Sequence, residues 1–213
     1  MLNEMQKDVL TELVNVYVGQ AAHMLSEMVS QRIDLTIPEV ELLSISDVHP
    51  TDRRFTFFFR EGHLITSSLK FGHEFNGKAS LLIPADQAKM LVSVCLGELP
   101  PEAGEGAESM RLVDTDLDVL KEISNVILNA IIGEFGNFLE LKLEYTLPDI
   151  ELVHVTNTDE SVFLQHDVYV LILHTSFQLA ETKVKGVIII ALSMNSITTL
   201  VSKIDELLEE SYG

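Results

Sequence analysis

The sequence contains an internal repeat, and this repeat constrains the fold more than any other feature. Residues 8–42 align with residues 118–152 without a gap, at an offset of 110 residues. Ten aligned positions are identical, and several of these are polar positions of a predicted helix, where packing does not require identity. A second stretch, residues 75–95, aligns with residues 184–204 at an offset of 109. The chain is therefore predicted to consist of two related halves.

Each half has the pattern of a long amphipathic helix, then strands, then a second helix. Alternation in "RFTFFFR" and "DVYVLILH" favours strands between the helices. Neither half has enough strands to bury a core alone, so we predict one α/β (α+β) domain spanning residues 1–213. In it, two repeats related by a pseudo-twofold axis share a central sheet flanked by long helices. The repeats cover about residues 1–97 and 114–213, and an acidic linker rich in Pro and Gly (98–113) joins them.

Composition excludes some classes of function. The formal net charge of −19 argues against binding to nucleic acid, whose phosphates require clustered Lys and Arg. The first residues lack the pattern of a signal peptide, and the longest apolar runs, such as 186–192, are too short for a bilayer. We therefore expect a cytoplasmic protein without membrane insertion. The single cysteine, Cys95, excludes an internal disulfide, and we expect it to be a core residue rather than a nucleophile.

A polar stripe lies along one side of the predicted first helix of each half. Residues at i, i+4 and i+7 of a helix project from the same side. The stripes are Asp8, Glu12 and Asn15 in the first half and Asp118, Glu122 and Asn125 in the second. Carboxylates near a helix start favour the helix dipole, so Asp8, Asp118 and the run "DTDLD" (114–118) also have a capping interpretation. Asn is a poor helix residue, however, and its recurrence beside Glu in both halves favours a function.

The chemistry available to such a stripe is limited. A carboxamide is neither a strong base nor a nucleophile, but its hydrogen bonds can hold a water molecule or an oxyanion. An exposed Glu can pair with a Lys of a partner. Together these groups suit the orientation of water against a bond that is already reactive. Hydrolysis of a phosphoryl group fits this description, because its loose transition state depends mainly on positioning.

The two stripes also match a family signature, Asp/Ser-x3-Glu-x2-Asn-x22-Pro, and the sequence thereby resembles the CheC-type chemotaxis phosphatases. The matching residues are Asp8, Glu12, Asn15 and Pro38 in the first half and Asp118, Glu122, Asn125 and Pro148 in the second. Length and duplication are similar to this family as well, so the resemblance covers nearly the whole chain.

This resemblance implies a fold, a reaction and a partner. It implies an α/β fold with pseudo-twofold symmetry and a hydrolase that acts on the phosphoryl-aspartate of a CheY-like response regulator in two-component signalling. Asn15 and Asn125 would position the attacking water, and Glu12 and Glu122 would pair with the regulator's active-site lysine. The regulator would supply Mg²⁺, so no cofactor is expected in this chain. The receptor deamidase CheD is a further partner that the resemblance suggests.

The first half departs from the family pattern beside its asparagine. Family members usually have small residues there, whereas this chain has Val14 and Tyr17. Tyr17 is large enough to obstruct docking of a regulator or to re-aim Asn15. We therefore expect Asn125 to be the stronger of the two sites.

Other classes of function stay open. One alternative is a non-enzymatic binding module, either a scaffold like that of the flagellar switch or an adaptor. An adaptor would bind a phosphorylated regulator and slow the loss of its phosphate. A metal hydrolase is the weakest alternative, since the seven histidines are scattered and none has a metal-type spacing such as HExxH.

Overall fold

The computed structural model of the chain describes residues 2–44, 62–98, 112–155, 168–179 and 182–212. The predicted strand "RFTFFFR" and most of the predicted linker 98–113 lie outside these ranges. Along the chain the elements are α1 (Glu4–Val29), β1 (Ile33–Ser44), β2 (Gly62–Gly72), β3 (Gly77–Pro84), α3 (Ala85–Cys95), α4 (Asp114–Leu139), β4 (Glu144–Tyr145), β5 (Asp149–Val155), β6 (Val168–Leu179), β7 (Thr182–Ser193) and α5 (Met194–Tyr212).

The strands of the described ranges form a seven-stranded antiparallel sheet whose order is symmetric with respect to the two halves. The order is β1-β6-β7-β3-β2-β5, and the short β4 also pairs with β2. Exchanging each strand with its repeat equivalent reverses this order and leaves it otherwise unchanged. In the central pair, β3 and β7, Ser80 lies opposite Ile189, its equivalent at the offset of 109. The predicted pseudo-twofold α/β fold is therefore confirmed, with its axis between these two strands.

Two glycines allow the central strands to approach each other. Gly77 and Gly186 are repeat equivalents, one on each side of the axis. A Cβ atom at Gly77 would overlap the backbone oxygen of Ala191, and one at Gly186 would lie 3.1 Å from the backbone oxygen of Leu82. Glycine is required where backbones come this close. The same pattern in both halves shows how the repeat builds the centre of the sheet.

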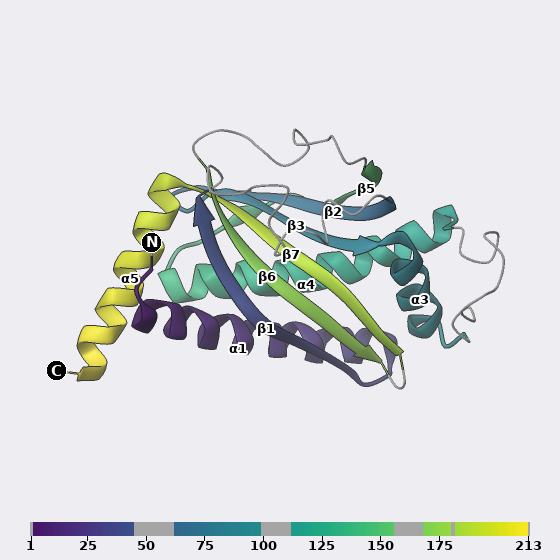
Figure 1. Cartoon of the computed structure of the whole chain (residues 1–213), viewed down its shortest axis with the longest axis horizontal. Coiled ribbons are helices and arrows are strands. Elements are labelled where there is room, and N and C mark those ends of the chain that lie inside the picture. The colour runs from purple at the N-terminus through teal and green to yellow at the C-terminus, as the bar shows by residue number, and fades with distance from the viewer. Residues whose placement is uncertain (1, 45–61, 99–111, 156–167, 180–181, 213) are drawn as a thin grey trace.

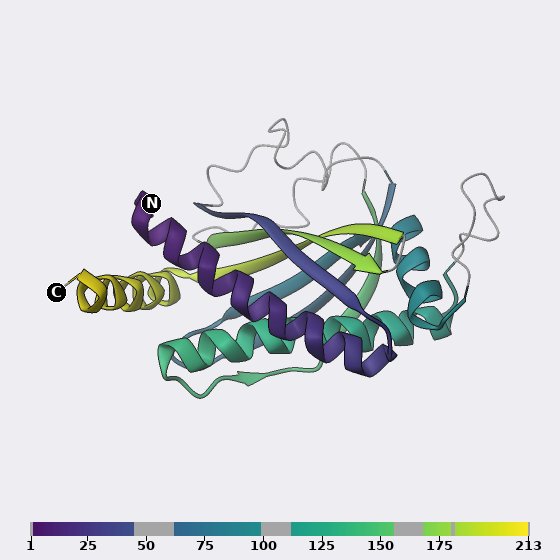
Figure 2. The ribbon, with the colours of Figure 1, turned by 90° about the horizontal axis from the view of Figure 1, so that it is seen from below.

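The main core lies between the sheet and the two long helices. Helices α1 and α4 run antiparallel across one face of the sheet, while α3 and α5 lie at its opposite ends (Figures 1 and 2). Burial of apolar side chains every three or four residues fixes the rotation of α1 and α4. A smaller apolar cluster on the other face consists of Leu64, Leu82, Val170, Ile172 and Val187. No described helix is long and apolar enough to cross a membrane.

The single cysteine ends helix α3 in a half-buried position. Burial raises the pKa of the Cys95 thiol to about 11. The thiolate is the nucleophilic form of cysteine, and with this pKa only a very small fraction of Cys95 is a thiolate near neutral pH. Cys95 packs against the main core, which agrees with the expectation of a core residue rather than a nucleophile.

Candidate active site

Both predicted stripes lie on the outer faces of the two long helices. Five of the six side chains are exposed, and Asn125 is partly exposed. The opposite face of α1 buries residues that include Leu10, Val14 and Leu25. Helix α4 buries Leu120, Ile123, Ile127 and Ile131 in the same way. Since the two helices pack on each other and on the sheet, their stripes are presented to solvent by a rigid framework.

The first turn of each stripe helix is anchored to the other half of the chain. The side chain of Gln6 accepts a hydrogen bond from the backbone N–H of Asn3, and its amide donates to Asp205 Oδ1 on α5 at 2.6 Å. At the equivalent position of α4, Asp116 accepts from the backbone N–H of Val113 at 2.9 Å. Lys89 Nζ of α3 lies 2.8 Å from Asp116 Oδ2, and both side chains are largely buried. The second helix of each half thus fixes the start of the other half's stripe helix.

These contacts show which acidic residue of the run 114–118 caps the start of α4. Within the run 114–118, the backbone cap is formed by Asp116, and Asp118 is exposed one turn after the helix start. Asp8 occupies the equivalent exposed position of α1. The capping interpretation of the run is therefore confirmed for Asp116. Sequence reasoning missed Lys89 and Asp205, because nothing local links them to the stripes.

The two signature prolines lie at different places relative to equivalent strands, one just before β5 and the other in the middle of β1. Pro148 is buried just before β5. Pro38 lies within β1, where the register against β6 shifts between Thr36 and Glu39. Such an irregularity is where a strand accommodates proline, which cannot donate a ladder hydrogen bond.

The two stripe asparagines differ in their surroundings. The Nδ2 group of Asn129 donates a hydrogen bond to Asn125 Oδ1 at 2.8 Å. In α1 the position equivalent to Asn129 is Gly19. Among the described residues, no side chain donates a hydrogen bond to Asn15. Asn129 was missed from the sequence, although a second Asn at i+4 in a helix is itself an unusual feature.

The expectation that Tyr17 obstructs the first site is wrong. Tyr17 is buried between α1 and α4, and its ring meets the ring of Phe135 edge-on, with centroids 5.4 Å apart. It follows Asn15 by two residues, which places it about 200° around the helix. Val14 is likewise fully buried. Both departures from the family pattern therefore change the contact between the helices and leave the surface around Asn15 open.

The Tyr17 hydroxyl is buried without a hydrogen-bond partner among the described residues. Burial raises the pKa of this hydroxyl far above its ordinary value, and the nearby Glu134 adds to the rise. Because an unpaired buried hydroxyl costs free energy, Tyr17→Phe should increase the free energy of unfolding by about 1 kcal/mol. Tyr17→Ala should decrease it by about 3–5 kcal/mol through the cavity that it leaves. Urea denaturation measures both changes, and a destabilised Tyr17→Phe variant would contradict the burial described above.

One surface groove continues the first stripe. It lies between the second half of α1 and the start of β1, has a volume of about 770 Å³, and its lining includes Gly19, Ser26 and Ile33. Gly19 is one turn beyond Asn15 on the same side of the helix. A partner docked on the first stripe would therefore also reach this groove.

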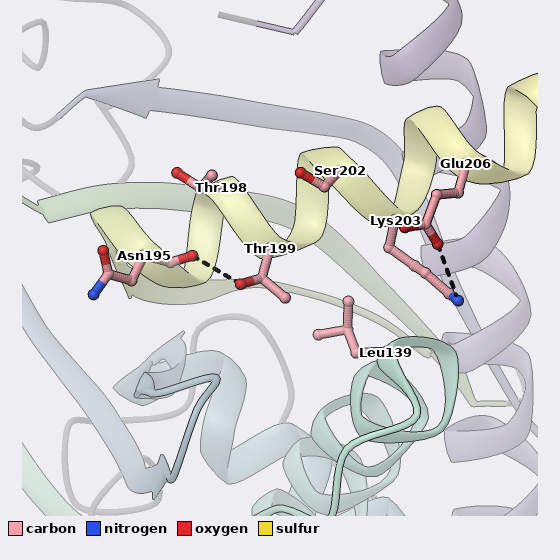
Figure 3. Close-up of a pocket in the computed structure, with 7 residues that line it drawn as sticks. All are labelled: Leu139, Asn195, Thr198, Thr199, Ser202, Lys203 and Glu206. Carbon is pink, nitrogen blue, oxygen red and sulfur yellow. Dashed lines mark hydrogen bonds and ion pairs between the residues drawn. The ribbon is translucent and has the colours of Figure 1, made fainter.

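A second hollow lies away from both stripes, between the end of α4 and the start of α5. Figure 3 shows its lining, which includes the hydroxyl groups of Thr198, Thr199 and Ser202. The amine of Lys203 lies 3.0 Å from Glu140 and 3.3 Å from Glu206. These carboxylates raise the pKa of Lys203 and satisfy its charge. No stripe residue lines this hollow, and it has the character of a junction between α4 and α5.

The stripes offer only carboxylate and carboxamide groups. Within the described ranges, no group of three or more His, Cys, Asp or Glu residues is placed to hold a metal ion. The chemistry that the stripes can perform is hydrogen bonding by the carboxamide and pairing by the carboxylate.

The fold and the paired stripes define a protein similar to the CheC-like family. The model of that family matches residues 5–42, which include the whole first stripe and Pro38. The resemblance predicted from the sequence is confirmed by this match.

Two named proteins of Bacillus subtilis have similar sequences. The flagellar motor switch phosphatase FliY is 23% identical over 158 residues, which are 73% of this chain and 38% of FliY. The CheY-P phosphatase CheC is 20% identical over 153 residues, which are 71% of this chain and 68% of CheC. The chain thus spans well under half the length of one of these relatives.

Solved structures share the fold. Thermotoga maritima FliY superposes with a TM-score of 0.73 at 16% identity, covering 97% of this chain and 98% of that one. The FliM middle domain of Helicobacter pylori superposes with a TM-score of 0.64 at 10% identity, covering 95% of this chain and 99% of that one. At these identities the likeness concerns the fold alone.

Proposed function

We propose that this chain is an aspartyl-phosphate phosphatase, which hydrolyses the phosphoryl-aspartate of a CheY-type response regulator. The observation that carries the proposal is the presence of two accessible Glu/Asn pairs at equivalent places on two packed helices. The names of the two Bacillus relatives, both phosphatases, support the same reaction.

In the proposed mechanism the helix contributes position rather than acid–base chemistry. The carboxylate of Glu12 or Glu122 pairs with the lysine of the regulator's active site and sets the docking. The carboxamide of Asn15 or Asn125 then reaches the phosphoryl group and holds a water molecule in line with the P–O bond. Mg²⁺ is expected to come from the regulator's own acidic pocket, where it would offset negative charge on the phosphoryl oxygens. Holding the water removes much of the entropic part of the barrier.

The alternative is an adaptor or a flagellar scaffold without enzymatic activity. Its support is the FliM middle domain, which covers nearly the same length of the chain with the same fold. An adaptor would shield the phosphoryl group and prolong its lifetime, whereas a phosphatase shortens it.

The test follows phosphate loss from CheY-type regulators of the same organism, each phosphorylated with acetyl phosphate and freed of excess donor. Wild-type chain at one-tenth of the regulator concentration should accelerate the loss well beyond the regulator's own rate, with multiple turnovers. An unchanged or slowed loss from every regulator, together with binding to the phosphorylated form, would replace the phosphatase with the adaptor.

A further inference from the structure

We propose that Asn129 is a positioning residue for Asn125, and that its replacement by Gly19 in the first half makes the two sites unequal in turnover. This inference rests on the proposed phosphatase function. It assigns Asn129 no contact with the substrate. Its effect passes through the side chain of Asn125.

The contact that carries the inference is a single hydrogen bond on the surface of α4. Asn129 lies one helical turn beyond Asn125, on the same side, and its Nδ2 lies 2.8 Å from Asn125 Oδ1. The terminal torsion of an Asn side chain has broad minima, so a free carboxamide presents its oxygen and nitrogen in many directions. Accepting this bond fixes the plane of the Asn125 amide. The remaining lone pair and the two N–H groups then have set directions before a partner arrives.

Asn129 itself has little structural reason to be there. Its Oδ1 is buried and has no hydrogen-bond partner among the described residues. A buried acceptor without a donor costs free energy, and Asn is also a poor residue for the middle of a helix. An alanine at this position would avoid both costs. The hydrogen bond that its side chain donates to Asn125 is therefore the interaction that accounts for an asparagine at this position.

The first half has no counterpart to this bond. Gly19 occupies the equivalent position one turn beyond Asn15, and a Cβ atom there would have nothing within 4 Å. Asn15 is exposed, and its carboxamide is left to rotate. Orientation of the first carboxamide must then be achieved during docking, which lowers turnover at that site.

The first experiment isolates the second site in an Asn15→Ala background and compares Asn129→Ala with the parent. Phosphate loss from the acetyl-phosphate-treated regulator gives kcat and KM. We expect kcat to fall about five- to tenfold with KM unchanged, because one orienting hydrogen bond is lost while the docking surface stays. The kcat of Asn129→Asp should fall by a similar factor, because a carboxylate has no proton to donate to Asn125 Oδ1.

Two readouts separate positioning from structural support. The melting temperature of Asn129→Ala should equal or exceed that of the parent, because a buried unpaired acceptor is removed. Asn137→Ala, which changes another exposed Asn on α4, should leave kcat unchanged. An unchanged kcat in Asn129→Ala, or full activity in Asn129→Asp, would overturn the inference.

The second experiment installs the missing group in the first half. In an Asn125→Ala background only the first site is active, and Gly19→Asn should raise its kcat about fivefold. Gly19→Ala is the matched control, because it also adds a Cβ atom and removes the backbone freedom of glycine but brings no carboxamide. Equal activities of these two variants would overturn the assignment of Gly19 as the cause of the inequality.

Failure of the inference and failure of the proposed function give different results. If no regulator loses phosphate faster with the wild-type chain, the function fails and the inference fails with it. If the wild type is active and Asn125→Ala is impaired while Asn129→Ala is not, only the role of Asn129 is wrong.

Discussion

Replacing Asn15 and Asn125 together with alanine is expected to abolish the acceleration of phosphate loss, a decrease of about a hundredfold or more. In the proposed mechanism each carboxamide holds the attacking water, and no other described side chain of the stripes can replace it. Asn15 is exposed and Asn125 partly exposed, so neither truncation creates a cavity. The melting temperature should therefore change little. Phosphate loss from a CheY-type regulator, measured at matched protein concentrations, checks the result.

The single variants rank the two sites. Asn125→Ala should lower the rate of phosphate loss more than Asn15→Ala does, because only the carboxamide of Asn125 is oriented in advance by Asn129. Binding to regulator loaded with beryllofluoride, a stable mimic of the phosphoryl group, should persist in the double variant because Glu12 and Glu122 remain. If the double variant keeps half of the wild-type rate, the water is held by other groups and the assignment of the asparagines is wrong.

Much of the fold could be predicted from the repeat. Because residues 8–42 and 118–152 align so closely, any structure for one half applies to the other, and a shared sheet follows from the small size of each half. The order of the strands could not be predicted in this way. It depends on which strands meet at the axis, and these are β3 and β7, which approach each other closely at Gly77 and Gly186. Nothing in the local pattern distinguishes these glycines from turn residues.

The candidate site was partly predictable for a similar reason. The helical period places Asp, Glu and Asn on one side, and the exposed stripes agree with it. The expectation for Tyr17 is wrong because closeness along the chain does not place a residue on the same side of a helix: Tyr17 lies on the buried face, opposite Asn15. The anchors Lys89–Asp116 and Gln6–Asp205 join residues 27 and 199 positions apart, so only the three-dimensional structure brings them together.

The buried pair of Lys89 and Asp116 is expected to have the largest effect on stability. Asp116→Ala leaves the Lys89 ammonium, whose side chain is 18% exposed, without the carboxylate that lies 2.8 Å away. It also removes the acceptor for the Val113 N–H. An unpaired buried charge costs about 3–5 kcal/mol, so thermal unfolding should occur about 10 °C lower. Circular dichroism melting checks the shift, and Arg32→Ala, which breaks an exposed pair, should leave the melting temperature nearly unchanged.

Two further variants identify the source of this cost. Asp116→Asn keeps an oxygen for the helix cap but removes the charge, so it should still be clearly destabilised. Adding Lys89→Met to Asp116→Ala removes the unpaired ammonium. The melting temperature should then return most of the way to that of the wild type, because apolar side chains can replace a buried ion pair. Without this restoration, the cost would lie in the cap rather than in the charge. Helix α4 begins only two turns before Glu122, so loosening its start disturbs the second stripe more than the first. Asp116→Ala and Asp116→Asn should therefore weaken binding of the regulator mainly at the second stripe.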